Sequence, residues 1–236
     1  METFADKDLS GARFDRCDLS GVVMRGVILD GADLDAPWLL KGGSLLVNGI
    51  DVVPYVQAEL ARQLPGYETR LATSPDGLRE AYERVQAAWQ QAVERAPVAL
   101  VDVSVDGEWS FSQTIRHLVM ATDVWLRGAV LGVEQPYHPL GQPFAEFEAE
   151  GYDTSVFVAG VPAFEDVLAA RADRVAIVQE LLAGVTEADL EVPRRHPWAP
   201  DVEVSTLRCL HTILDEEWSH LRFALRDLQT AEAPAP

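Results

Sequence analysis

Near its C-terminus the chain reads Leu210-His211-Thr212-Ile213-Leu214-Asp215-Glu216-Glu217-Trp218-Ser219-His220. The pattern predicts a helix that starts after Ser205 and runs to about Thr230, because its leucines recur at helical intervals. Such a helix needs neighbouring helices that cover its apolar face. The leucines of this face are Leu207, Leu210, Leu214, Leu221 and Leu228.

Two side chains beside this face could bind a metal ion. Glu216 and His220 are four residues apart, so they lie on one side of the helix about one turn apart. Zn²⁺ and Ni²⁺ accept oxygen and nitrogen donors of this kind. His117, in another amphipathic stretch, is available as a third ligand. A histidine on one helix and such a pair on another would form a three-ligand metal site, so His117, Glu216 and His220 are candidate ligands. No catalytic residue is expected beyond these ligands.

The spacing leaves other assignments open. Glu217 stands three residues before His220, and most acid–histidine pairs of this kind lie on solvated helix faces. On a helical wheel Glu217 falls within the apolar stripe, where its charge needs a partner. We expect that partner to be an arginine such as Arg116, or a histidine. Whether Glu217 or His211 replaces one of the three proposed ligands is left undecided.

Three further long helices are predicted. The first begins at the Ser74-Pro75 capping pair, and the second begins at a capping box, Ser110 to Gln113, and runs to about Leu131. The third spans residues 162 to 184. We therefore expect a mainly α protein with a four-helix bundle. The connection between the second and third helices, 132–160, is long enough to suggest a functional role.

The rest of the chain divides around this bundle. Residues 1–36 form a repeat segment, 37–73 a connector, 74–230 the bundle, and 231–236 a disordered tail. In the connector, Asn48-Gly49 predicts a hairpin turn and Pro54 begins a helix that ends near Leu64. Between the first two bundle helices, residues 98–105 are rich in valine and are expected to form a short strand.

The N-terminal segment has a period of five residues, which is neither helical nor strand-like. This period is typical of a solenoid in which each pentapeptide forms one side of a square coil. The segment resembles the pentapeptide-repeat family, which implies a right-handed β-helix. Fewer than two coils are present, so we expect the segment to need support from other structure. The repeating apolar residues are Phe4, Leu9, Phe14, Leu19, Met24, Leu29 and Leu34.

Composition limits the classes of partner. The 236 residues carry a net charge of −19, which argues against nucleic acid and against anionic membranes. The N-terminus is acidic where a signal peptide would be basic, and no stretch is apolar enough to span a bilayer. Cys17 and Cys209 match no disulfide or metal spacing, so we expect a protein of the reducing cytoplasm.

The residues around His117 (109–118) and around Glu216 and His220 (215–222) resemble the DinB superfamily of metal-binding four-helix bundles. The similarity covers roughly residues 74–228. In many members the two ligands on the last helix are histidines, whereas Glu216 matches a branch of mycothiol-dependent isomerases. The resemblance implies that His117, Glu216 and His220 bind a divalent metal, zinc or nickel, with an open coordination position.

The same resemblance implies a function. We expect a metal-dependent thiol S-transferase or thiol-dependent isomerase that acts on a small electrophile through a metal-bound thiolate. The chain contains only two lysines among 19 basic residues, a bias typical of GC-rich genomes. Mycothiol is therefore the favoured thiol if the source is an actinobacterium. The alternatives are a metal-dependent hydrolase and a non-catalytic metal-binding dimeric scaffold or sensor. Relatives also commonly pair, which implies a homodimer.

Overall fold

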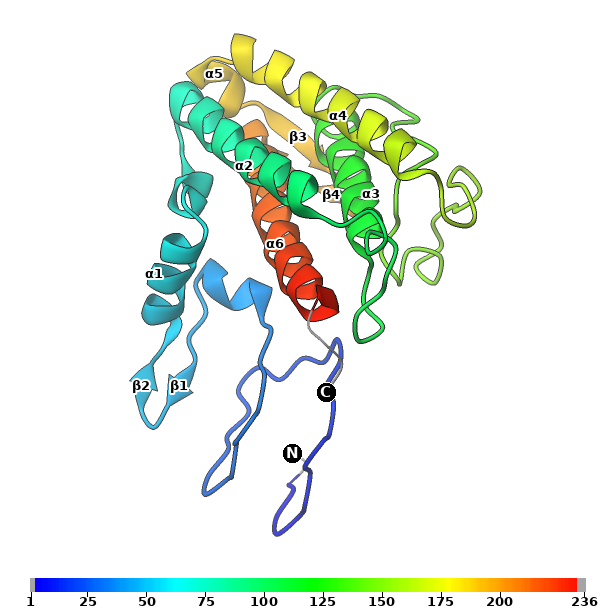
Figure 1. Cartoon of the computed structure of the whole chain (residues 1–236). Coiled ribbons are helices and arrows are strands. Elements are labelled where there is room, and N and C mark those ends of the chain that lie inside the picture. The colour runs from blue at the N-terminus through cyan, green and yellow to red at the C-terminus, as the bar shows by residue number, and fades with distance from the viewer. Residues whose placement is uncertain (1–2, 233–236) are drawn as a thin grey trace. The chain divides into compact units, whose positions relative to one another are not determined.

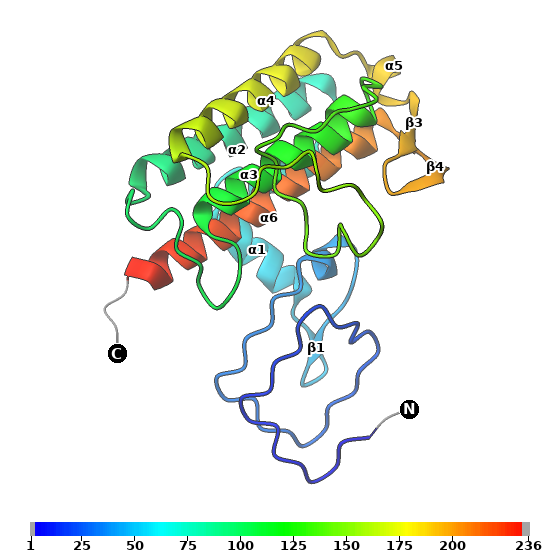
Figure 2. The same cartoon turned by 90° about the vertical axis from the view of Figure 1, so that its right-hand side faces the viewer.

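The computed structural model describes residues 3–232, and the chain separates into two compact units, Met1–Ala36 and Pro37–Pro236. The larger unit contains the predicted bundle, whose long helices are visible in Figure 1 and, from the side, in Figure 2. Among the described residues, none of the helices has the length and apolarity that crossing a bilayer requires. The bundle helices are α2 (Pro75–Arg95), α3 (Phe111–Thr122), α4 (Phe164–Gly184) and α6 (Thr206–Glu232).

Each bundle helix packs against two others, so that α2, α4, α3 and α6 form a closed ring around one core. Trp218 and Leu221 of α6 are almost fully buried there, as are Tyr82 of α2 and Ile115 of α3. The apolar face predicted for the last helix is therefore the face that packs. Because α3 and α6 are adjacent, side chains that the sequence separates by about 100 residues can meet between them.

The predicted caps determine where the helices begin. The Ser74 hydroxyl accepts a hydrogen bond from the Gly77 N–H, and Pro75 occupies the first helical turn. At α3 the full capping box forms, with Ser110 and Gln113 bonding each other's backbone N–H groups. α4 begins at Phe164 rather than at Pro162, and α6 extends to Glu232. Residues 231 and 232 are thus helical, and the rest of the predicted tail lies outside the described residues.

α3 continues as a π-helical segment, Asp123–Gly128, which the sequence analysis did not anticipate. Asp123 is completely buried. Its carboxylate accepts hydrogen bonds from Arg174 Nε at 2.6 Å, Arg127 Nη1 at 3.2 Å and the His138 N–H at 2.7 Å. One buried carboxylate therefore joins the π-helix, α4 and the long connection. Buried charges of this kind persist because several donors satisfy them together.

The long connection between α3 and α4 is ordered by two sets of contacts. Arg116 donates to the carbonyl oxygens of Leu140, Gly141 and Gly160 at 3.0 to 3.4 Å. A second apolar cluster covers the outer side of α3, and Phe147 at its centre is 1% exposed. Its aromatic members, apart from Phe147, are Tyr137, Phe144, Tyr152, Phe157, Trp125 and Trp198.

Short elements complete the larger unit. The predicted hairpin is present, with the positive φ angles of Asn48 and Gly49 forming its turn. The strand expected over residues 98–105 is wrong: this stretch forms successive turns, because no neighbouring strand pairs with it. A hairpin that was not predicted leads into α6. The short elements are β1 (Leu46–Val47), β2 (Ile50–Asp51), α1 (Val53–Gln63), α5 (Glu187–Leu190), β3 (Pro193–His196), β4 (Ala199–Ser205) and the 3₁₀ helices Pro37–Lys41 and Tyr67–Leu71.

The N-terminal unit keeps the five-residue period but not the predicted β-helix. A positive φ recurs at every fifth residue from Asp6 to Gly31, so the backbone turns once in each pentapeptide. None of residues 3–36 is in a strand, and the repeating apolar side chains are 44% to 61% exposed. Strand ladders need coils stacked above and below one another, and fewer than two coils do not supply them.

Candidate metal centre

His117 on α3 and the Glu216–His220 pair on α6 meet between the two helices. Glu216 Oε2 lies 3.0 Å from His220 Nε2 and 3.6 Å from His117 Nε2. One donor atom from each residue falls within 4.8 Å of the other two. Ligands about 2.1 Å from one tetrahedral ion stand about 3.4 Å apart, so these separations suit a single small cation.

The main chain orients the imidazole of His117. Its Nδ1 lies 3.0 Å from the carbonyl oxygen of Gln142, which can only accept a hydrogen bond. Nδ1 therefore carries the proton, and the lone pair of the neutral ring is on Nε2, facing Glu216. Two acceptors that face each other at 3.6 Å need a cation or a second proton between them. Metal-binding histidines are commonly oriented by an outer hydrogen bond of this kind.

Electrostatics favour the protonation states of Glu216 and His220 that a cation requires. Burial raises the pKa of Glu216, but its interactions with the nearby imidazoles of His117 and His220 outweigh burial and hold this pKa well below its usual range. Burial is also the main cause that lowers the pKa of His220, and the neighbouring His117 adds to it. An ionised carboxylate beside a neutral imidazole is the donor set expected of a metal ligand.

Aromatic rings line the centre. Trp109, just before α3, lies with its ring centroid 4.6 Å from that of His117 and 5.9 Å from that of His220. The two imidazoles are themselves 4.7 Å apart, and Phe223 contacts His220 edge-on at 5.7 Å. The side chains of His117 and His220 are each 13% exposed, whereas that of Glu216 is 33% exposed, so the centre is open to solvent on the carboxylate side.

The alternative ligands are engaged elsewhere. Glu217 is 1% exposed, and Arg171 Nη2 lies 2.5 Å from each of its carboxylate oxygens. The partner is an arginine, as expected, but it is Arg171 and not the example given, Arg116, which binds carbonyl groups of the long connection. His211 Nε2 lies 2.8 Å from the Ala72 carbonyl oxygen, and neither His211 nor Glu217 joins the three-residue cluster.

Other acidic, histidine and cysteine side chains of the larger unit have structural roles. Asp215 forms ion pairs with Lys41 at 3.0 Å and with Arg70 at 3.7 Å, which hold the connector on α6. His138 and His196 each accept a hydrogen bond from a backbone N–H two residues further on. Cys209 is fully buried, like a small apolar residue.

Several residues that line the candidate centre or support it were not identified from the sequence. Arg171 and Arg174 recur at a three-residue interval among the buried apolar residues of α4, and that pattern was a usable signal for buried acidic partners. Trp109 was visible next to the capping box of α3. The role of Gln142 depends on its carbonyl oxygen, so no pattern of side chains could have revealed it.

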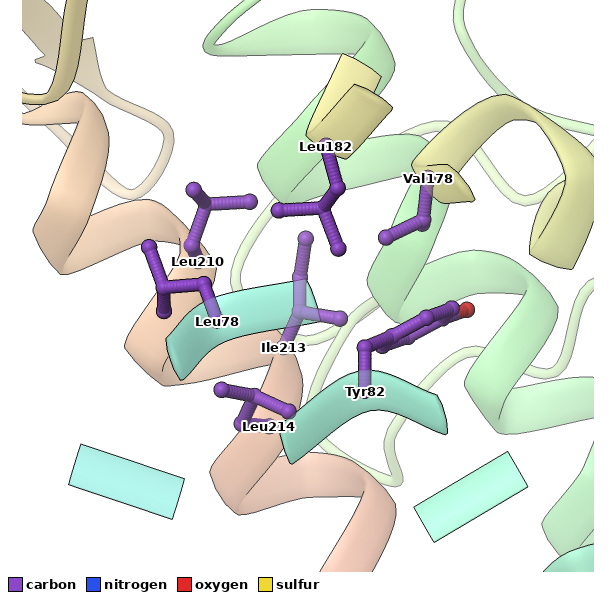
Figure 3. Close-up of a pocket in the computed structure, with 7 residues that line it drawn as sticks. All are labelled: Leu78, Tyr82, Val178, Leu182, Leu210, Ile213 and Leu214. Carbon is purple, nitrogen blue, oxygen red and sulfur yellow. The ribbon is translucent and has the colours of Figure 1, made fainter. Parts of the chain in front are cut away.

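A small cavity inside the bundle is a packing defect and not a ligand site. It lies between α2, α4 and α6, where Figure 3 shows the aliphatic side chains pointing toward one another. Its volume is about 10 Å³, the threshold for one water molecule, and its walls are almost entirely hydrocarbon. The residues that line it are Leu78, Tyr82, Val178, Leu182, Leu210, Ile213 and Leu214.

Comparison with known families agrees with both parts of the chain. The family described as the DinB superfamily matches residues 81–224, which span the bundle and the three clustered residues. The family described as pentapeptide repeats (8 copies) matches residues 8–36. Searches of curated proteins and of solved structures gave no match.

Proposed function

This chain belongs to the DinB superfamily, and from that membership we propose that its bundle is a metal-dependent enzyme. The reaction that we propose is transfer of a low-molecular-weight thiol, such as mycothiol, to a small electrophile, or isomerisation assisted by such a thiol. His117, Glu216 and His220 are the proposed ligands of a zinc or nickel ion. The observation that carries the proposal is the approach of both imidazole Nε2 atoms to one oxygen of Glu216.

The residues present fit such an ion. Two neutral nitrogens and one carboxylate form a set that Zn²⁺ and Ni²⁺ accept, and three protein ligands are typical of catalytic rather than structural sites. A divalent ion held there lowers the pKa of a thiol or water that binds to it. The protein supplies the rest: Gln142 orients His117, and Trp109 covers the two imidazoles.

An external thiol fits the chain better than a protein nucleophile. Cys209 is the one cysteine in the sequence after residue 36, and burial raises the pKa of its thiol to about 11. Such a thiol is inert at neutral pH. In the proposed transfer, the sulfur of the external thiol bonds to the electrophilic carbon. The leaving group departs with its bonding electron pair, and the thiol proton is released to water.

Metal content tests the ligand assignment. We expect His117→Ala and His220→Ala to lose most of the zinc or nickel that elemental analysis finds in the wild-type protein. The matched control is His211→Ala, on the same helix as His220 but bonded to a backbone carbonyl group. Unchanged metal content in both site variants, with folding verified by circular dichroism, would refute the assignment.

Turnover tests the reaction. The metal-loaded protein should catalyse the reaction of 1-chloro-2,4-dinitrobenzene with at least one of mycothiol, bacillithiol and glutathione, and His220→Ala should abolish that rate. A metal-loaded protein that is inactive with every thiol but cleaves esters would instead be a hydrolase. Inactivity in both assays would leave the scaffold or sensor role, and gel filtration would then establish whether the protein is the proposed homodimer.

A further inference from the structure

Two aromatic side chains, Trp109 and Phe223, flank the imidazoles of the candidate centre. The two aromatic rings differ in the groups that contact them. Phe223 is contacted by two guanidinium groups, with the Cζ atoms of Arg222 and Arg226 at 4.4 and 5.5 Å from its ring centroid. Trp109 is half-buried, and its ring lies against the imidazoles of His117 and His220. Trp109 therefore remains partly accessible directly beside the three clustered residues.

The chain holds Trp109 from both sides. The residue before it, Glu108, forms an ion pair with Arg226 of α6 at 2.6 Å, and its carbonyl oxygen accepts a hydrogen bond from the Ser104 hydroxyl. The residue after it, Ser110, is the buried N-cap of α3. An aromatic side chain fixed in this way offers a preformed surface at a small entropic cost.

We propose that Trp109 determines which electrophiles the site accepts, by stacking on a planar, electron-poor group of the substrate. The proposal rests on the function proposed above, since it places the substrate beside His117 and His220. The face of an indole ring is electron-rich, so it attracts electron-poor π systems in offset stacks and gains less from saturated groups of similar size. The substrate class is therefore conjugated or aromatic electrophiles rather than saturated alkyl compounds.

Binding of an inert probe tests the proposal without any turnover. The probe is 2,4-dinitrotoluene, which is planar and electron-poor and has no leaving group. Nitrocyclohexane, a saturated compound of similar size, is the comparison. Equilibrium dialysis of the full-length protein, zinc-loaded and after EDTA treatment, gives the Kd of each probe. This measurement does not depend on tryptophan fluorescence, which the Trp109 substitutions would themselves change. Elemental analysis of the same samples reports the metal separately.

We expect Trp109→Leu to weaken dinitrotoluene binding about 2- to 10-fold, the range measured for aromatic pairs beyond the area they bury. Nitrocyclohexane binding should change less than that. Trp109→Phe should retain most of the affinity for dinitrotoluene, and Trp109→Met replaces the leucine variant if that variant does not fold. The control is Trp125→Phe, since Trp125 contacts His196 and not the clustered histidines.

Three results would overturn the proposal: no binding of dinitrotoluene by the wild-type protein, equal binding by Trp109→Leu, or an equal loss for both probes. These results are distinguishable from a failure of the proposed function. A protein without metal, or one inactive with every thiol, can still show the Trp109-dependent preference for the planar probe. A metal-loaded, active enzyme can equally lack that preference.

Discussion

Replacing Arg171 by methionine leaves the Glu217 carboxylate without the guanidinium group that contacts both of its oxygens at 2.5 Å. Glu217 is 1% exposed and Arg171 is 7% exposed, so water cannot take the place of the lost partner. The backbone on α6 also stays fixed, because the Trp89 indole N–H donates to the Glu217 carbonyl oxygen at 3.2 Å. The carboxylate is therefore held in place without a counter-charge.

The expected loss of unfolding free energy is about 3 to 5 kcal/mol, the usual cost of removing one partner of a buried ion pair. The loss should depend on pH. Burial raises the pKa of Glu217, and Arg171 opposes that effect in the wild-type protein. In the variant the folded-state pKa rises further above the unfolded value of about 4.3. The variant therefore loses little stability at a pH below the unfolded-state pKa and progressively more as the pH rises above it. The drop in unfolding free energy caused by Arg171→Met should be larger at pH 8 than at pH 5.

Urea unfolding followed by circular dichroism, with EDTA in every sample, measures this loss without a contribution from metal binding. The control is Arg62→Met, whose partner Glu59 lies on the surface and whose own side chain is 71% exposed. That change should cost less than about 1 kcal/mol. In the double variant Arg171→Met, Glu217→Leu both charges are gone, so most of the stability should return. A loss below about 1 kcal/mol in Arg171→Met, or a double variant as unstable as the sum of the two single ones, would refute the reasoning.

Two further predictions concern other buried groups. Asp123→Asn should lower the free energy of unfolding by about 3 kcal/mol in urea unfolding, because two arginines lose their shared buried counter-charge. The control, Asp173→Asn, removes an exposed partner of the same Arg174 and should lower it by under about 1 kcal/mol. Equal losses would contradict the assigned role of burial. Cys209 should resist iodoacetamide in the native protein from pH 7 to 9, because burial raises the pKa of its thiol to about 11. The exposed Cys17 should react under the same conditions. Mass spectrometry of the labelled protein measures both, and rapid labelling of Cys209 in the native protein would contradict its burial.

The helices and the central part of the candidate site were predictable from local signals. The capping residues Ser74 and Ser110 placed the starts of two helices, because each cap is completed within a few residues of chain. The four-residue spacing of Glu216 and His220 placed both on one face of α6 for the same reason. The pairing of these two with His117 required the family resemblance, since nothing local connects them.

Other features depend on contacts between distant segments. The π-helical segment at Asp123 exists beside Arg174 of α4 and the His138 N–H, both remote in sequence. Glu217 was recognised as a buried charge in need of a partner, but arginines on several helices could have met that need. Only the packing of α4 against its neighbours selected Arg171 over Arg116.

By itself the sequence determined the helical periods, the caps, the five-residue repeat and the shared helix face of Glu216 and His220. The tertiary structure alone decided which charges pair, that His117 is oriented by the Gln142 carbonyl oxygen, and that Trp109 lies against both imidazoles. It also showed that so short a repeat segment forms turns without strands. The physical reason is the sequence separation of the interacting residues. Periodicity and capping are satisfied within about ten residues, whereas ion pairs, ring contacts and strand ladders join segments that only the packed chain brings together.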